Sequence, residues 1–102
     1  MSRRAQIEAM LAKSPADVFL LYGLAMELVT EGDVDAGVRQ FQRVLEADPN
    51  YQAAFFQLGQ VLSGAGRIDE AKDWLVRGIE VAGRIGNHHA AGEMQGFLDQ
   101  LD

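Results

Sequence analysis

The chain has 102 residues, of which 48% are hydrophobic and 24% charged, with no cysteine and a formal net charge of -6. This length predicts a single domain, and the missing cysteines exclude disulfides, thiol chemistry and cysteine-based zinc sites. The sequence has no run of about eighteen apolar residues that would span a membrane, and its nine scattered basic residues argue against nucleic-acid binding. We therefore expect a soluble protein of a reducing compartment, the cytoplasm.

Amphipathic segments follow one another along the whole chain. Leu21, Leu24 and Leu28 recur at the spacing of a helix that buries one face. Gly32 suits the left-handed end of that helix, and Asp33 suits the N-cap of the next one. We expect six helices, near 3–13, 17–30, 34–47, 51–64, 68–84 and 87–101.

The two prolines of the chain, Pro15 and Pro49, are 34 residues apart. At that offset residues 18–51 align with 52–85, and the identical pairs are Leu24 and Leu58, Leu28 and Leu62, Gly32 and Gly66, Asp35 and Asp69, Arg43 and Arg77, and Glu46 and Glu80. A two-helix repeat of this length indicates a helical solenoid.

This repeat resembles the tetratricopeptide repeat. The first copy supplies Leu21, Leu24, Ala25, Leu28, Phe41, Val44 and Pro49 to the family pattern, and the second supplies Phe55, Leu58, Gly59, Leu62, Ala71 and Leu75. Gly37 replaces the first alanine of the pattern in the first copy, and in the second copy Gly78 replaces the second alanine and Gly83 the proline. Glycine keeps the close helix contact but costs roughly 1 kcal/mol of helix propensity. The resemblance implies an all-α fold, a right-handed helical solenoid of antiparallel helix pairs.

The period also assigns the two ends of the chain. Ile7 and Met10 occupy the slots of Phe41 and Val44, so residues 3–15 are interpreted as a leading half repeat. Residues 18–51 and 52–85 are then two full repeats, and 86–102 form a C-terminal capping helix. We expect residues 1–102 to make one domain.

The resemblance further implies a concave groove lined by the first helix of each repeat. The groove positions proposed as the partner-binding site are Phe19, Tyr22, Met26 and Val29 in the first repeat, with Phe56 and Gln60 in the second. An apolar stripe outside the core pattern is typical of an interaction surface. An alternative is that the leading and C-terminal helices fold over this stripe and bury it.

The same positions indicate the chemistry of the partner. A subgroup of the family clamps acidic chaperone tails with Lys and Asn at the positions held here by Tyr22, Met26, Phe56 and Gln60. The clamp is therefore absent, and an apolar or basic amphipathic helical segment is favoured.

Three functions follow, in decreasing order of support. The first is a non-catalytic protein–protein interaction module without metal, cofactor or catalytic residues. The second is a homodimeric assembly protein that uses the same surface. The third, a metal or enzyme site at His88, His89 and Glu93, is disfavoured because adjacent residues of a helix point apart and two ligands are too few for zinc. We expect a simple His89–Glu93 contact instead.

Overall fold

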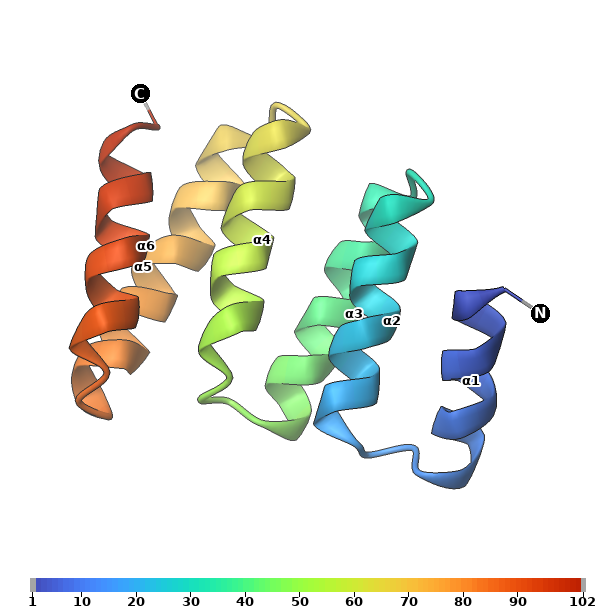
Figure 1. Cartoon of the computed structure of the whole chain (residues 1–102). Coiled ribbons are helices and arrows are strands. Elements are labelled where there is room, and N and C mark those ends of the chain that lie inside the picture. The colour runs from blue at the N-terminus through green and yellow to red at the C-terminus, as the bar shows by residue number, and fades with distance from the viewer. Residues whose placement is uncertain (1, 102) are drawn as a thin grey trace. The chain divides into compact units, whose positions relative to one another are not determined.

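A computed structural model describes residues 2–101. They form the helices α1 (Arg3–Lys13), α2 (Val18–Thr30), α3 (Val34–Ala47), α4 (Gln52–Gly64), α5 (Ile68–Arg84) and α6 (His88–Asp99), packed in sequential antiparallel pairs (Figure 1). All six predicted helices are confirmed, with bounds that differ by two residues at most. In the part of the chain that the structure describes, no helix is both long and apolar enough to cross a membrane.

The helices divide between two compact units. The N-terminal unit, which ends at Pro49, holds α1, α2 and α3, and the C-terminal unit, which starts at Asn50, holds α4, α5 and α6. In the N-terminal unit α2 packs against both α1 and α3, and in the C-terminal unit α5 packs against both α4 and α6 (Figure 1). In each unit one helix, α2 or α5, therefore packs against both of the others.

The core of the N-terminal unit comes from one face of each of its helices. Ile7 of α1, Ala25 and Leu28 of α2, and Phe41 and Val44 of α3 are all buried. Phe41 and Val44, which belong to the repeat pattern, are thus core residues of α3, and α1 contributes the apolar side chain that the repeat period assigned to it. Burial of such side chains is the main favourable term in the free energy of folding.

The core of the C-terminal unit depends on two glycines that let helices approach closely. A Cβ added to Gly59 of α4 would lie 2.5 Å from Cδ2 of Leu75 on α5. A Cβ added to Gly78 of α5 would lie 2.6 Å from Sδ of Met94 and from Cβ of Phe55. Both distances are far below van der Waals contact, so any larger residue would push these helices apart.

Three turns of the chain share one backbone geometry. Gly32, Gly66 and Gly86 have φ angles of 90°, 78° and 76°, a conformation that L side chains rarely adopt. In each turn the N–H after the glycine donates to a carbonyl five residues earlier: Asp33 to Leu28 at 3.0 Å, Arg67 to Leu62 at 2.8 Å, and Asn87 to Ala82 at 2.8 Å. This is the Schellman ending of a helix, and it confirms the predicted role of Gly32.

The residue after each turn glycine also starts the next helix. The side chains of Asp33 and Asn87 accept hydrogen bonds of 3.1 Å from the N–H groups of Ala36 and Ala90. The predicted cap at Asp33 is therefore confirmed. Arg67 is the exception, because α5 begins without a hydrogen bond from a capping side chain.

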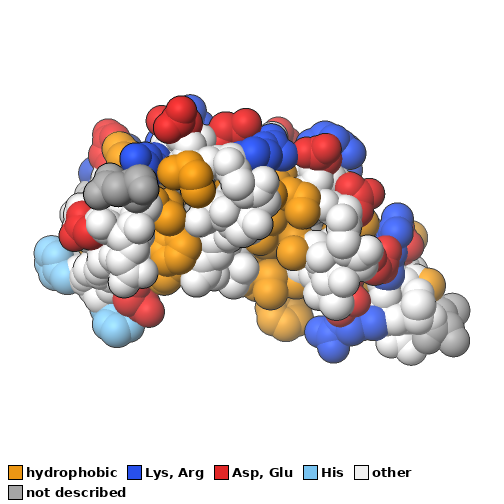
Figure 2. All heavy atoms as spheres, turned by 90° about the horizontal axis from the view of Figure 1, so that it is seen from above, with side chains coloured by type: hydrophobic (Ala, Val, Ile, Leu, Met, Phe, Trp, Pro, Cys, Tyr) orange, Lys and Arg blue, Asp and Glu red, His pale blue; other side chains and the backbone are white. Residues whose placement is uncertain are grey.

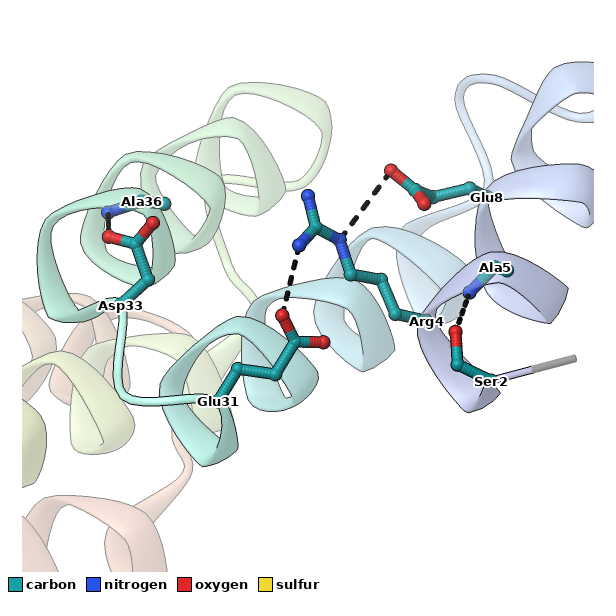
Figure 3. Close-up of polar contacts among 7 residues, drawn as sticks. All are labelled: Ser2, Arg4, Ala5, Glu8, Glu31, Asp33 and Ala36. Carbon is teal, nitrogen blue, oxygen red and sulfur yellow. Dashed lines mark hydrogen bonds and ion pairs between the residues drawn. The ribbon is translucent and has the colours of Figure 1, made fainter.

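Charged contacts attach α1 to α2 (Figure 3). Nη1 of Arg4 donates to Oε1 of Glu31 at 2.9 Å, and its Nε lies 3.7 Å from Oε2 of Glu8. Next to it, Nε of Arg3 lies 2.6 Å from Oε1 of Glu27. The hydrogen bond and the negative charge of Glu31, helped by the charge of Glu8, raise the pKa of Arg4 above its ordinary value. These ion pairs link the start of α1 to the C-terminal end of α2.

Candidate partner-binding surface

A hollow of about 460 Å³ lies between α1 and α2. Its lining residues are Arg3, Gln6, Ile7 and Met10 of α1, and Phe19, Leu20, Tyr22, Gly23 and Met26 of α2. We call this the α1–α2 hollow. The side chains of Phe19, Met10 and Met26 are 76%, 48% and 36% exposed. Helix α1 thus forms one wall of the hollow without burying the predicted residues Phe19 and Met26.

Tyr22, the third predicted residue in this hollow, has two roles. It is half-buried, and its ring meets the ring of Phe41 on α3 with centroids 5.7 Å apart and an angle of 62° between the planes. An edge-on contact of this kind stabilises the fold in addition to the area that it buries. Tyr22 therefore belongs to both the hollow and the core of the N-terminal unit.

Val29, the fourth predicted residue of this repeat, does not line the hollow. Its Cγ2 lies only 2.5 Å from the place that a Cβ of Gly37 would take, so this methyl group faces α3. The signal for this arrangement was present in the sequence, because Gly37 replaces the alanine of the repeat pattern. A missing methyl group on one helix leaves room for a branched side chain on the other.

Phe56 and Gln60 line a second hollow, of about 480 Å³, in the C-terminal unit. We call it the α4–α6 hollow, and its lining is Gln52, Ala53, Phe56, Gln57, Gln60, Asn87, His89, Ala90, Glu93 and Met94. The ring of Phe56 is half-buried, and its centroid lies 5.9 Å from that of Phe97 on α6. The C-terminal helix therefore covers part of Phe56, and amide side chains make this hollow more polar than the other.

The two histidines lie on the surface of the C-terminal unit (Figure 2). Nε2 of His89 is 3.1 Å from Oε1 of Glu93, one helical turn away, and this confirms the expected contact. Across residues 2–101, no three His, Asp or Glu side chains gather at a spacing that would hold a metal ion.

Charge is mixed over the face seen in Figure 2, where basic and acidic side chains alternate. In the α1–α2 hollow the only charged lining residue is Arg3, and its Nε already contacts Glu27. The hollow is therefore mainly an apolar surface with one cation at its rim.

Comparison with known proteins places this geometry in a family. The profile described as Tetratricopeptide repeat matches residues 28–84, more than half of the chain. The chain is 33% identical over 96 residues to the TPR repeat-containing protein PA0015 of Pseudomonas aeruginosa, a match that covers 94% of this chain and 91% of that protein.

Solved structures of the same fold cover nearly the whole chain. The solution structure of protein BPP2914 from Bordetella parapertussis superposes with a TM-score of 0.85 at 28% identity, over 99% of this chain and 88% of that one. The Yersinia enterocolitica type III secretion chaperone SycD, in complex with a peptide of the translocator YopD, superposes with a TM-score of 0.82 at 16% identity, over 96% and 76%. With the family profile and the P. aeruginosa relative, these findings show that the chain belongs to the tetratricopeptide repeat family.

Proposed function

We propose that this protein is a non-catalytic interaction module that holds an apolar or amphipathic segment of another protein against the α1–α2 hollow. One observation carries the proposal: Met10, Phe19 and Met26 surround a single hollow while their side chains remain exposed to water. Covering apolar surface is worth about 25 cal/mol per Å². A partner segment that covers all three side chains would therefore gain most of its binding free energy there.

The chemistry of the hollow favours an apolar segment over an acidic tail. Tyr22 and Met26 supply ring and thioether surface where a charged clamp would need Lys and Asn. Methionine adapts its shape to different partners, and aromatic side chains are enriched at interfaces. SycD, which has the same fold, was solved with a peptide of YopD, and this precedent supports a peptide-binding role for the present chain.

We also propose that the α4–α6 hollow is a second contact surface in the C-terminal unit. Phe56 offers part of a ring, and Gln60, which is exposed, offers an amide that both donates and accepts hydrogen bonds. Such a surface suits the polar side of an amphipathic segment.

Selection from a displayed library of random 16-residue peptides tests the proposal. We expect wild-type protein to enrich peptides with apolar residues at i, i+3, i+4 and i+7, and Phe19→Glu to lose them. Val76→Glu is the matched control, because Val76 is 51% exposed on α5 and lies outside both hollows. Enrichment that survives Phe19→Glu, or that Val76→Glu also abolishes, would refute the assignment of this surface.

Molar mass by light scattering over a range of concentrations separates a foreign partner from self-association. A monomer at every concentration agrees with the proposal. A dimer that Phe19→Glu dissociates would replace it, since the hollow would then hold a second copy of the chain. The melting temperature of such a dimer would also rise with protein concentration.

A further inference from the structure

The α1 wall of the α1–α2 hollow corresponds to the face of α5 that meets α4. Two repeat periods, or 68 residues, align Arg3 with Ala71, Gln6 with Trp74, Ile7 with Leu75, and Met10 with Gly78. In the C-terminal unit three of these α5 positions, Trp74, Leu75 and Gly78, contact α4. The ring of Trp74 is 6.3 Å from that of Phe55, while a Cβ on Gly59 would collide with Leu75 and a Cβ on Gly78 with Phe55.

The α2 wall corresponds to the α6 wall of the α4–α6 hollow when the two helices are aligned on their N-caps. Asp17 and Asn87 are the N-caps of α2 and α6, and each side chain accepts a hydrogen bond from the N–H three residues further on. Aligned on these caps, Phe19, Leu20 and Gly23 fall on His89, Ala90 and Glu93. Those three α6 residues line the hollow that α6 forms with α4.

The α1 wall of the α1–α2 hollow is therefore equivalent to the face of α5 that α4 covers, and the α2 wall is equivalent to the α6 side of the α4–α6 hollow. We propose that the α1–α2 hollow is the binding site, here called the seat, of an amphipathic helix from a partner protein. That helix packs on α1 as α4 packs on α5, and it runs antiparallel to α1. The inference rests on the proposed function and specifies it, because it replaces a general apolar segment with one helix in one orientation. The bound helix would complete the leading half repeat.

The differences between the two sites define the sequence of that helix. In the C-terminal unit Phe55 of α4 packs over Gly78, whereas Met10 fills the equivalent space in the α1–α2 hollow. The partner helix therefore carries a small residue where α4 has Phe55. Ile7 is equivalent to Leu75, which packs against Gly59 of α4. The partner helix therefore also carries a small residue at the position of Gly59, four residues after the position of Phe55. One turn further along, a carboxylate would face Arg3.

The direct test is a titration of the full chain, labelled with ¹⁵N, with two synthetic peptides observed by NMR. The first has the sequence of residues 51–65 with Phe55→Ala and Ser63→Glu, and the second differs only in keeping Phe55. We expect the first peptide to shift amide signals of α1 and α2 around Met10 and Phe19. The second should bind about tenfold more weakly, a difference of about 1.4 kcal/mol, because its ring collides with Met10.

Two variants of Met10 make the test specific. Met10→Ala creates on α1 the space that Gly78 provides on α5. The peptide that keeps Phe55 should then bind more tightly than the peptide with Phe55→Ala. Met10→Glu places a charge in the seat and should abolish the binding of both peptides. Val76→Glu, which introduces the same charge on α5, should leave their binding intact. Circular dichroism confirms that each variant keeps its helices.

Several results would overturn the proposed seat. The proposal is wrong if the amide shifts are confined to α5 and α6. It is also wrong if the two peptides bind equally well, or if Met10→Glu leaves their binding unchanged. A dimer of the chain that Met10→Glu dissociates would assign the seat to a second copy instead. If the library-selected peptides depend on Phe19 but not on Met10, the seat is wrong and the proposed function stands, so the two failures are distinguishable.

Discussion

Tyr22 meets Phe41 edge-on, with ring centroids 5.7 Å apart. Phe41 is completely buried, whereas Tyr22 also lines the α1–α2 hollow. One aromatic ring thus joins the candidate binding surface to the core of the N-terminal unit. A change at Tyr22 would alter folding and binding together, which makes Phe19 the better position for testing binding alone.

Tyr22→Ala is expected to lower the free energy of unfolding by about 1–3 kcal/mol, because it removes the aromatic pair and leaves a gap beside Phe41. Phe19→Ala should change it by less than about 0.5 kcal/mol, since that side chain is mostly in water. Urea unfolding followed by circular dichroism measures both values. Equal effects of the two substitutions would show that the contact with Phe41 contributes little.

Gly37→Ala is expected to destabilise the N-terminal unit despite the better helix propensity of alanine. The new methyl group would lie 2.5 Å from Cγ2 of Val29, and the β-branched valine has few rotamers with which to move away. Overpacking costs about 1–3 kcal/mol, against a gain of about 1 kcal/mol in propensity.

The double variant Gly37→Ala/Val29→Ala checks this cause. If the collision with Val29 is responsible, the double variant should lose less free energy of unfolding than the sum of the two single losses, by about 1 kcal/mol. Strict additivity in thermal or urea unfolding would mean that some other effect of Gly37 dominates.

Gly78→Ala should destabilise the C-terminal unit by at least about 1–3 kcal/mol, because its Cβ would collide with both Phe55 and Met94. Gly92→Ala in α6 is the matched control. A Cβ there meets nothing within 4 Å, so it should stabilise the protein by up to about 1 kcal/mol. Both values come from chemical unfolding, and a Gly78→Ala protein as stable as wild type would contradict the close packing of α4, α5 and α6.

Arg67→Asn is expected to stabilise α5. Asparagine is a good N-cap, and the equivalent Asp33 and Asn87 already cap α3 and α6 in this way. The gain of about 1 kcal/mol is partly offset by loss of the exposed contact between Arg67 and Glu70, at 2.7 Å, which is worth less than about 1 kcal/mol. A higher melting temperature would support the prediction, and a lower one would show that the Glu70 contact matters more than the missing cap.

The helices were predictable because local signals agreed with one another. The apolar period gave the buried faces, and Gly32 with Asp33 marked an end and a start on consecutive residues. The 34-residue repeat then carried this interpretation from one hairpin to the next. Local signals of this kind depend on the backbone preferences of single residues and on the spacing of apolar side chains, and both can be read from the sequence.

The direction of single side chains was less predictable. Val29 stands at a groove position of the repeat pattern, yet it fills the space above Gly37 in α3. The contact between Phe56 and Phe97 was also missed, because α6 lies outside the 34-residue alignment and its register could not be taken from it. The role of Phe19, Tyr22, Met26, Phe56 and Gln60 in partner binding stays a prediction.

The three glycine turns have a consequence for how the chain folds. Each reverses the chain in about three residues, so the helices that it joins meet after closing a very short loop, at little entropic cost. Nearly all stabilising contacts within a unit then link residues close in sequence, a property that gives helical proteins folding times of microseconds to milliseconds. We therefore expect the helix pairs α2–α3, α4–α5 and α5–α6, which these turns join, to form early, with α1 docking afterwards.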